Sequence, residues 1–206
     1  MRSPIKRVWF GAFRFDITED VFEPSEDTFL FAENLDIKED DFVLDVGAGC
    51  GILGILAAQK AKSVLSVDIN PYAVSCAKHN SVLNGIRNKM DFLQTDLLKI
   101  LSDKTLFDVI LFNSPYLPSE PYELNTWIGR AWAGGATGRD VVDRFIPQAA
   151  VHLKNNGRIL LLQSTLTNVD LTIQRFKEHH LKATVKANSK LPFFETITLI
   201  EAKSLQ

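Results

Sequence analysis

Seven short apolar runs punctuate the chain, and the stretches between the earlier runs carry helical spacing. The runs are FVLDV (42–46), SVLSVD (63–68), KMDFLQ (89–94), FDVILF (107–112), GRILLLQ (157–163), ATVKA (183–187) and ETITLIEA (195–202). Apolar residues recur at helical intervals between them, as in residues 71–84. Strands that alternate with helices pair in parallel through right-handed crossovers. The pattern predicts a doubly wound, mostly parallel α/β sheet of seven strands.

The last two runs break the alternation. Only residues 188–194 separate them, too few for a crossover helix, so we expect an antiparallel hairpin at the end of the chain. In the usual strand order of such sheets the third run, 89–94, lies at an edge. Two helix starts are also predicted: Asn70 caps a helix that has Pro71 at its first position, and residues 137–140 fit a capping box for a helix through about residue 154.

The length, composition and charge of the chain limit the classes of protein to which it can belong. A chain of 206 residues fits one domain, and 46% apolar with 23% charged residues is ordinary for a soluble globular protein. The net charge of −2 gives no general field that would attract nucleic acid. The first sixteen residues are basic, with Arg2, Lys6, Arg7 and Arg14 against Asp16, and we expect them to form a solvated, mobile arm.

The remaining composition argues against metals and membranes. Two cysteines, Cys50 and Cys76, are too few for a structural zinc site or a disulfide framework, and the four histidines show no metal spacing. No stretch approaches the ~20 apolar residues of a membrane span, and the N-terminus lacks the apolar core of a signal peptide. We therefore expect no bound metal, no membrane contact and a cytoplasmic location.

A glycine-rich loop follows the first run. The stretch LDVGAGCGILG (44–54) places Gly47, Gly49 and Gly51 where a strand gives way to a helix, and residues 49–54 fit the G-x-G-x-x-G pattern of dinucleotide sites. The pattern does not identify the cofactor, because several different cofactors bind to glycine loops of this kind. Glycines permit positive φ and let a ligand approach the backbone at the carboxyl end of a central strand.

Three acids stand at the ends of three successive strands. Asp45 would place a carboxylate beside the cofactor, which suits an ammonium group and repels a pyrophosphate; Asp68 can accept from both ribose hydroxyls, and Asp96 from an adenine amino group. S-adenosylmethionine carries these three groups in this order. Asp68 would serve NAD equally well. Each acid also has a structural alternative: a turn carboxylate, an Asx cap before Asn70 and a helix N-cap, respectively.

The loop NSPY (113–116) leaves the fourth strand beside the first and faces the same cleft. A planar nitrogen with two N–H groups is a poor nucleophile and needs two acceptors in fixed positions. Asn113 offers its side-chain oxygen, and Ser114 its backbone carbonyl, held extended because Pro115 disfavours the helical region for the residue before it. Both bonds would strengthen as positive charge builds on the nitrogen, and Tyr116 can stack on the planar group. The alternatives are an Asx turn and ordinary loop punctuation.

These motifs together resemble class I S-adenosylmethionine-dependent methyltransferases with a Rossmann-like fold. Within them, the chain is similar to the HemK-like N5-glutamine methyltransferases that modify the GGQ motif of peptide-chain release factors. Their usual signature is N-P-P-Y, and Ser114 replaces its first proline here. The stretches EPSEDTFLF (23–31) and RAWAGGATGRDVVDRF (130–145) resemble the short archaeal and eukaryotic branch.

The resemblance implies S-adenosylmethionine as cofactor and a single methyltransferase domain, 1–206. Residues 1–38 would form an N-terminal segment and a cofactor-covering helix that places Thr28 over the cofactor, with Glu26 and Asp27 nearby; residues 39–206 would form the catalytic core. The cofactor would contact Thr28, Asp45, Gly47, Gly49, Gly51, Asp68, Ile69, Asp96, Leu97 and Asn113, and the catalytic residues would be Asn113, Ser114, Pro115 and Tyr116. Both stretches also have a structural alternative. Ser25 would then only cap the start of a helix, and the glycines at 134, 135 and 138 would only form a tight turn before the helix that follows them.

The expected function is therefore methylation of a glutamine in a release factor. The alternative is N6-adenine methylation of DNA, which uses the same chemistry. We expect protein methylation instead, because the chain ends soon after the seventh strand, with no length left for a target-recognition domain, and because its near-neutral charge predicts no basic surface for DNA. Protein lysine methylation and an NAD-dependent or purely nucleotide-binding role stay open. The resemblance also implies a small zinc-ribbon activator protein that covers the edge strand 89–94.

Overall fold

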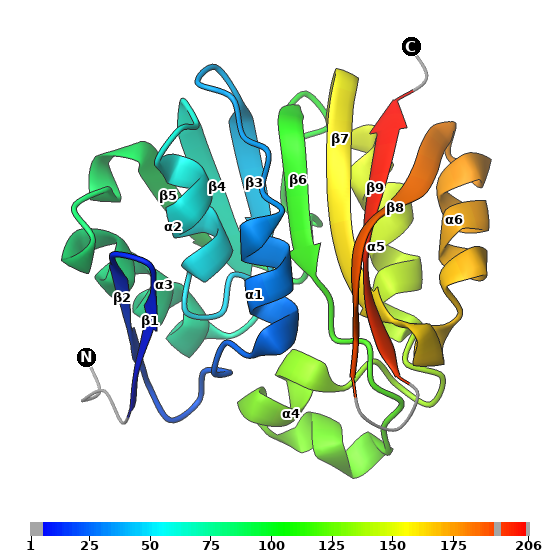
Figure 1. Cartoon of the computed structure of the whole chain (residues 1–206), viewed down its shortest axis with the longest axis horizontal. Coiled ribbons are helices and arrows are strands. Elements are labelled where there is room, and N and C mark those ends of the chain that lie inside the picture. The colour runs from blue at the N-terminus through cyan, green and yellow to red at the C-terminus, as the bar shows by residue number, and fades with distance from the viewer. Residues whose placement is uncertain (1–5, 192–194, 205–206) are drawn as a thin grey trace.

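The computed structural model describes residues 6–191 and 195–204. Its main sheet has seven strands in the order β5-β4-β3-β6-β7-β9-β8, and β1 and β2 form a separate two-stranded sheet (Figure 1). The strands are β1 Lys6–Phe10, β2 Phe13–Ile17, β3 Phe42–Val46, β4 Ser63–Asp68, β5 Met90–Gln94, β6 Phe107–Asn113, β7 Leu153–Ser164, β8 Leu181–Lys190 and β9 Thr196–Ser204. The α-helices are α1 Glu26–Glu33, α2 Ile52–Ala58, α3 Pro71–Leu83, α4 Trp127–Trp132, α5 Asp140–Val151 and α6 Val169–Glu178.

Helices cover both faces of the main sheet. Residues of α1, α2 and α3 pack with the hairpin β1–β2 into one apolar core, and residues of α5 and α6 pack into a second core on the opposite face. Ile55 of α2 and Phe145 of α5 are each fully buried in their layers. The carboxyl ends of the parallel strands meet at the lower edge in Figure 1, where α4 also lies. Among the described helices, none is long and apolar enough to cross a membrane.

The predicted sheet is confirmed. Strands β3 to β7 pair in parallel, β9 runs antiparallel to both β7 and β8, and β5 lies at the edge. The structure also confirms the cap at Asn70, whose side chain accepts from the N–H of Tyr72 while Pro71 occupies the first helical turn. The main difference is length, since β7 begins at Leu153, several residues before the predicted run.

The capping box predicted at residues 137–140 is wrong. Helix α5 begins at Asp140, and its N-cap is Arg139, which makes no side-chain capping bond. Thr137 instead lies in a glycine turn: Gly138 has φ +71° and its N–H donates to the carbonyl of Gly135, while the N–H of Asp140 donates to Gly134. The glycines set the entry to this helix.

The mobile N-terminal arm is also wrong, because residues 6–17 form a docked hairpin. Phe15 and Ile17 are buried, and the Asp16 carboxylate bonds Arg7 and His79 and pairs with Arg14. Burial alone would raise the pKa of Asp16, but these partners hold it below its usual value. The basic residues of this segment therefore serve the fold, except for Arg2, which lies outside the described residues.

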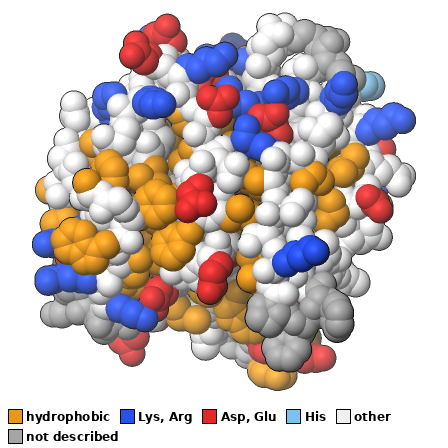
Figure 2. All heavy atoms as spheres, in the orientation of Figure 1, with side chains coloured by type: hydrophobic (Ala, Val, Ile, Leu, Met, Phe, Trp, Pro, Cys, Tyr) orange, Lys and Arg blue, Asp and Glu red, His pale blue; other side chains and the backbone are white. Residues whose placement is uncertain are grey.

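One side of the hairpin stays open to solvent. Trp9 is 62% exposed, whereas Phe10 stacks on Phe29 of α1 with ring centroids 5.8 Å apart. Figure 2 shows hydrophobic side chains gathered on the left of this face, over the region that holds β1, β2 and α2 in Figure 1. The hairpin thus offers a buried aromatic residue, Phe15, and an exposed one, Trp9, for testing its attachment.

We predict that Phe15→Ala lowers the free energy of unfolding by about 3–5 kcal/mol, the usual cost of truncating a buried phenylalanine. Its control, Trp9→Ala, removes an exposed ring from the same hairpin and should change stability by less than about 0.5 kcal/mol. Urea denaturation of both variants measures the difference. Equal, small effects would mean that the hairpin is not docked.

Candidate active site

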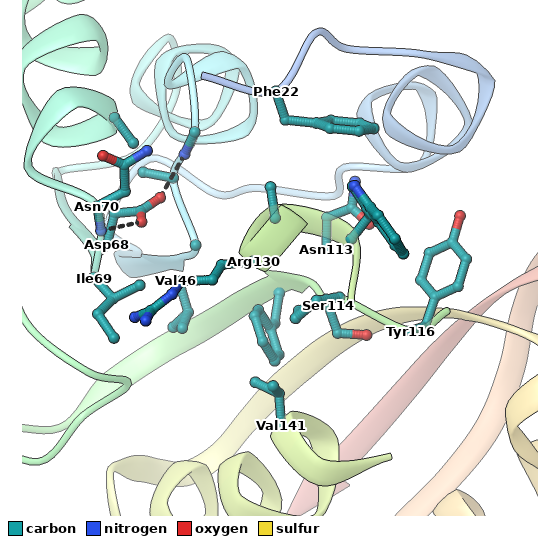
Figure 3. Close-up of a pocket in the computed structure, with 18 of the residues that line it drawn as sticks. Phe22, Val46, Asp68, Ile69, Asn70, Asn113, Ser114, Tyr116, Arg130 and Val141 are labelled. Carbon is teal, nitrogen blue, oxygen red and sulfur yellow. Dashed lines mark hydrogen bonds between the residues drawn. The ribbon is translucent and has the colours of Figure 1, made fainter. Parts of the chain in front are cut away.

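A cavity of about 550 Å³ opens at the carboxyl ends of the parallel strands. The ends of β3, β4 and β6 line it from the sheet, most residues of the segment 21–28 line another side, and α4 contributes Trp127 and Arg130 (Figure 3). This is the place where ligands bind in doubly wound sheets. Within the described residues, no group of three or more His, Cys, Asp or Glu side chains could hold a metal ion.

The glycine loop between β3 and α2 is bound to the neighbouring strand β4. The N–H of Ala48 donates to the carbonyl of Val67, and the N–H of Gly49 donates to Oδ2 of Asp68 at 2.9 Å. Gly49 has φ +56°, a conformation that glycine adopts without steric cost. Gly47, Ala48, Gly49 and Cys50 line the cavity, whereas Gly51 packs toward Ala77 of α3 and does not.

Asp45 supports this loop from beneath. Its side chain is 1% exposed and does not line the cavity; Oδ2 accepts from the N–H of Gly54 at 3.1 Å and from Ser66 Oγ at 3.3 Å. A Cβ on Gly54 would lie 2.6 Å from this oxygen, so the last glycine of the pattern makes room for the carboxylate. Burial raises the pKa of Asp45 to about 7.

Asp68 holds the end of β4. Besides Gly49, its carboxylate accepts from the N–H of Asn70 through Oδ1 at 2.8 Å, and it lines the cavity together with Ile69 (Figure 3). Burial raises its pKa above the usual value, although the backbone N–H groups oppose that shift. Each carboxylate oxygen takes one of these bonds and keeps a lone pair for a ligand.

The third strand end contributes residues 95–97. No helix follows Asp96; its carboxylate bonds Lys99 and Arg144, and these partners lower its pKa against the effect of burial. Leu97 has φ +54° and lines the cavity with Asp96. Thr95 also lines it, and its buried Oγ1 has no hydrogen-bond partner within the described structure. A buried hydroxyl without a partner favours a polar ligand group beside it.

Asp27 joins α1 to the loop after β6. Its Oδ1 accepts from Ser25 Oγ, from the N–H of Thr28 and from Thr28 Oγ1, and its Oδ2 accepts from Asn113 Nδ2 at 3.4 Å and Tyr116 Oη at 3.2 Å. Asn113 Nδ2 also donates to Thr28 Oγ1 at 3.2 Å. The Asn113 amide is thus oriented through its nitrogen. Ser25 is the N-cap residue of α1 but makes no capping bond, because its hydroxyl binds Asp27.

Ser114 is anchored to β7. Its Oγ donates to the carbonyl of Leu162 at 2.7 Å, its N–H donates to the same carbonyl at 3.4 Å, and it is buried. The N-P-P-Y signature that this loop resembles has a proline here, which would restrict the backbone. In this chain a buried side-chain hydrogen bond restrains the loop at the same position.

Gly134 and Gly138 support the other side of this loop. The N–H of Leu117 donates to Trp132 and the N–H of Gly134 donates to Leu117. A Cβ on Gly134 would come within 2.7 Å of the Pro115 carbonyl, and one on Gly138 within 2.4 Å of the Tyr116 carbonyl. These glycines therefore do more than open a helix: they allow the backbone to pack against NSPY.

Most of the residues predicted from the sequence come together. Those that line the cavity are Thr28, Gly47, Gly49, Asp68, Ile69, Asp96, Leu97, Asn113, Ser114, Pro115 and Tyr116. Asp45 and Gly51 do not line it. Sequence reasoning missed Thr95, Trp127 and Arg130, and it placed Asp27 only near the cofactor. The acid in the first turn of α1 was visible, but nothing in the sequence connected it to residues 113–116.

Relatives of the chain settle its family. It is 42% identical over 183 residues to a Methanocaldococcus jannaschii chain named as a protein N5-glutamine methyltransferase, with 87% of this chain and 90% of that one covered. It is 32% identical over 193 residues to human methyltransferase HEMK2, covering 88% and 89%. The chain belongs to the HEMK2-like protein N5-glutamine methyltransferases. The family model of ribosomal protein L11 methyltransferase (PrmA) matches residues 27–114.

Solved structures agree with this membership in the HEMK2-like family. A chain of the E. cuniculi Mtq2–Trm112 complex, described as responsible for methylation of the translation termination factor eRF1, matches with a TM-score of 0.68 at 25% identity, over 90% of this chain and 99% of that chain. The L11 methylase of Lactobacillus delbrueckii subsp. bulgaricus matches with a TM-score of 0.65 at 24% identity, over 89% and 81%, which shows the shared fold.

Ser114→Ala tests the anchor of the NSPY loop. Because the variant removes the hydroxyl that donates to the buried Leu162 carbonyl at 2.7 Å, we predict a loss of about 1 kcal/mol in the free energy of unfolding. Hydrogen exchange at the Leu117 amide should also become faster. Ser75→Ala, which changes an exposed serine of α3, is the control. Unchanged exchange at Leu117 would show that the loop is held without this hydroxyl.

Proposed function

We propose that this HEMK2-like protein transfers the methyl group of S-adenosylmethionine to the side-chain amide nitrogen of a glutamine in a peptide-chain release factor. The observation that carries the proposal is the orientation of Asn113: its amide nitrogen binds Asp27 and Thr28, which leaves its oxygen for the substrate. The names of relatives support the substrate class, since they include N5-glutamine and release factor glutamine methyltransferases. The E. cuniculi Mtq2–Trm112 complex is likewise described as methylating a termination factor, eRF1.

The cavity fits S-adenosylmethionine in size and in chemistry. Small-molecule sites commonly enclose ~300–1,000 Å³, and this one encloses about 550 Å³. When bound, the cofactor supplies a methyl group on a positively charged sulfur. In our proposal Asp68 accepts from the ribose hydroxyls, Thr95 and Asp96 offer polar groups to the adenine, and Ile69 and Leu97 contact its faces.

The other residues predicted to bind the cofactor belong to the glycine loop, support it from beneath, or lie next to Asn113. Gly47 and Gly49 let the cofactor approach the backbone, and Thr28 lies next to Asn113 where the methyl group would be presented. Asp45 acts on the cofactor indirectly, because its carboxylate holds Gly54 and Ser66 beneath the loop. Gly51 likewise serves the packing of the loop on α3.

The acceptor nitrogen would donate its two hydrogens to Asn113 Oδ1 and to the Ser114 carbonyl. Both bonds strengthen as the nitrogen gains positive charge during attack, so the preorganised dipoles stabilise the transition state. A general base is not needed before transfer, since the proton can leave afterwards. Tyr116 is a poor candidate for a base: burial and the Asp27 carboxylate raise the pKa of its phenol, which stays protonated and donates to Asp27.

A glutamine amide uses this pair of acceptors better than a lysine does. A lysine ammonium must first lose a proton, and it carries no planar N–H pair. The described residues that contact the Asp27 carboxylate already supply five hydrogen bonds to it. Asp27 is therefore committed to holding α1 and Asn113, which leaves it poorly placed to deprotonate a substrate.

A small zinc-ribbon activator would pair with β5. This strand lies at the edge of the main sheet, Met90 is buried, and Asp91 and Gln94 are exposed. An open backbone edge suits the addition of a strand from another protein. The E. cuniculi relative forms a complex with Trm112, which supports such a partner here. Because release factors work with ribosomes, we place the enzyme in the cytoplasm.

Asn113→Ala should reduce kcat on the order of 10²-fold while cofactor affinity stays nearly unchanged, because the variant loses an acceptor that acts in the transition state. Single-turnover methylation and calorimetric titration with S-adenosylmethionine measure the two quantities. Asn188→Ala, at an exposed position of β8, is the control. A collapse of cofactor affinity with normal turnover of the bound complex would contradict the catalytic role.

Asp68→Ala should instead weaken cofactor binding roughly 10- to 100-fold, because a charged acceptor contributes about 1.5–3 kcal/mol. The same titration measures this loss, and Asp103→Ala, an exposed turn residue, controls for charge. If affinity did not change, Asp68 would be limited to its bonds with Gly49 and Asn70.

The proposed substrate is tested by incubating the enzyme, with its activator, with labelled S-adenosylmethionine and a release factor. Mass spectrometry of the digested product should place one methyl group on the glutamine of the GGQ motif. The matched control is the release factor with that glutamine changed to alanine, which should take up no label. Label on DNA, or on the control protein at an equal level, would overturn the proposal.

A further inference from the structure

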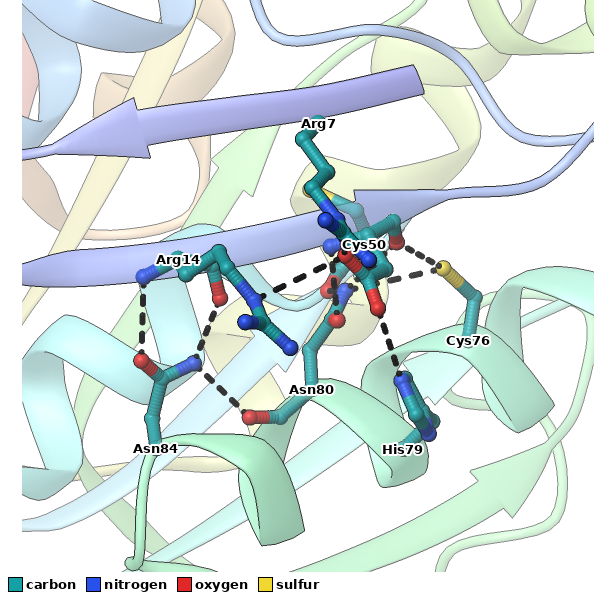
Figure 4. Close-up of polar contacts among 8 residues, drawn as sticks. Arg7, Arg14, Cys50, Cys76, His79, Asn80 and Asn84 are labelled. Carbon is teal, nitrogen blue, oxygen red and sulfur yellow. Dashed lines mark hydrogen bonds and ion pairs between the residues drawn. The ribbon is translucent and has the colours of Figure 1, made fainter. Parts of the chain in front are cut away.

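Asn80 of α3 and Asn84, the C-cap residue of that helix, hold the free edge of strand β2. Asn84 Oδ1 accepts from the N–H of Arg14 and its Nδ2 donates to the Arg14 carbonyl; one turn earlier, Asn80 makes the same pair of bonds with Asp16 (Figure 4). The spacing of residues along the helix and along the strand explains why two asparagines four positions apart reach Arg14 and Asp16. Residues four apart on a helix lie about 6 Å apart, close to the roughly 6.7 Å between alternate residues of a strand.

The two asparagines differ in the partner of their remaining amide hydrogen: Asn84 Nδ2 also donates to the Asn80 carbonyl within the helix, whereas the corresponding bond of Asn80 reaches the glycine loop. Asn80 Nδ2 donates at 2.9 Å to the carbonyl of Cys50, which belongs to the glycine loop and lines the cavity. The two amide hydrogens of Asn80 thus bond the Asp16 and Cys50 carbonyls, and its oxygen bonds the Asp16 N–H. The side chain is 0% exposed. Three backbone groups from two distant segments therefore depend on one buried amide.

The bond to Cys50 restrains a side of the glycine loop that β4 does not reach. Strand β4 holds Ala48 and Gly49 through Val67 and Asp68, as described above. Asn80 holds the next residue from α3. The Asp16 end of this connection is fixed in turn, because its carboxylate is bonded by Arg7 and His79.

We propose that Asn80 is a positioning residue for the cofactor: its amide ties the docked hairpin to the glycine loop and sets the backbone of Cys50 against the cavity. The inference rests on the proposed function in that it takes S-adenosylmethionine as the ligand of this cavity. Asn80 acts through the loop and does not line the cavity itself. Asn80 itself is buried, and both amide hydrogens and its oxygen are bonded, which favours a single loop conformation.

The test compares Asn80→Ala with Asn84→Ala in the full chain. Both variants remove two bonds to the hairpin, and only Asn80→Ala also frees the Cys50 carbonyl. We expect both to lower the melting temperature, but only Asn80→Ala to weaken S-adenosylmethionine binding, by tenfold or more in a calorimetric titration. In the ligand-free proteins, hydrogen exchange at the amides of Gly49 and Gly51 should rise in Asn80→Ala alone.

Either of two results would overturn the inference: wild-type affinity and loop exchange in Asn80→Ala, or an equal loss of affinity in Asn84→Ala. If Asn80→Ala does not fold, Asn80→Ser takes its place, since a hydroxyl has one hydrogen and cannot donate to both carbonyls. A wild-type protein that fails to bind S-adenosylmethionine would contradict the proposed function. The exchange measurement, which needs no ligand, would still decide the role of Asn80.

Discussion

The contact between Asp27 and the loop after β6 organises the site. A single buried carboxylate accepts from Ser25 and Thr28 at the start of α1 and from Asn113 and Tyr116, which lie far along the chain. Hydrogen bonds to an ionised acceptor are stronger than neutral ones. The position of α1 over the sheet and the orientation of the Asn113 amide are consequently determined together. Loss of this carboxylate would leave both without their common restraint.

The two loops that form the cavity are held in similar ways. Side-chain hydrogen bonds tie each loop to a neighbouring element. Asp68 and Asn80 bind the backbone of the glycine loop at Gly49 and Cys50, whereas Ser114, within the NSPY loop, donates to the Leu162 carbonyl of β7. A cofactor and an acceptor nitrogen held on two such loops would have a fixed approach. Fixed geometry matters here because the amide nitrogen is a weak nucleophile, and correct orientation lowers the barrier of a two-reactant step.

The sequence was sufficient to predict the sheet, its antiparallel end, the edge position of residues 89–94 and most of the cavity wall. Strand runs and glycine loops are local signals, and the topology rules of parallel sheets connect them. The hairpin β1–β2 was missed although its signal is present: KRVWF and FRFDI alternate around the two residues Gly11 and Ala12, and Gly11 has φ +57°. The basic residues drew the interpretation toward a mobile arm.

Other features depend on contacts that no local pattern encodes. The sequence could not show that Asp45 turns beneath the loop toward Gly54, that Asp96 pairs with Arg144, or that Asp27 reaches Asn113, because each partner lies at least nine positions away. The departure from N-P-P-Y at Ser114 is another example. Its compensation, the bond to Leu162, is visible only when β6 and β7 are paired.

The central claim is that Asn113 and Ser114 form a pair of fixed acceptors that selects a planar amide nitrogen. Competition between two acceptor peptides tests it most directly: one carries glutamine, and the other carries lysine at the same position in an otherwise identical sequence. Both are offered with S-adenosylmethionine to the enzyme and its activator. We expect kcat/KM for the glutamine peptide to exceed that for the lysine peptide on the order of 10²-fold, the effect of one transition-state hydrogen bond or more. Equal or faster methylation of the lysine peptide would contradict it.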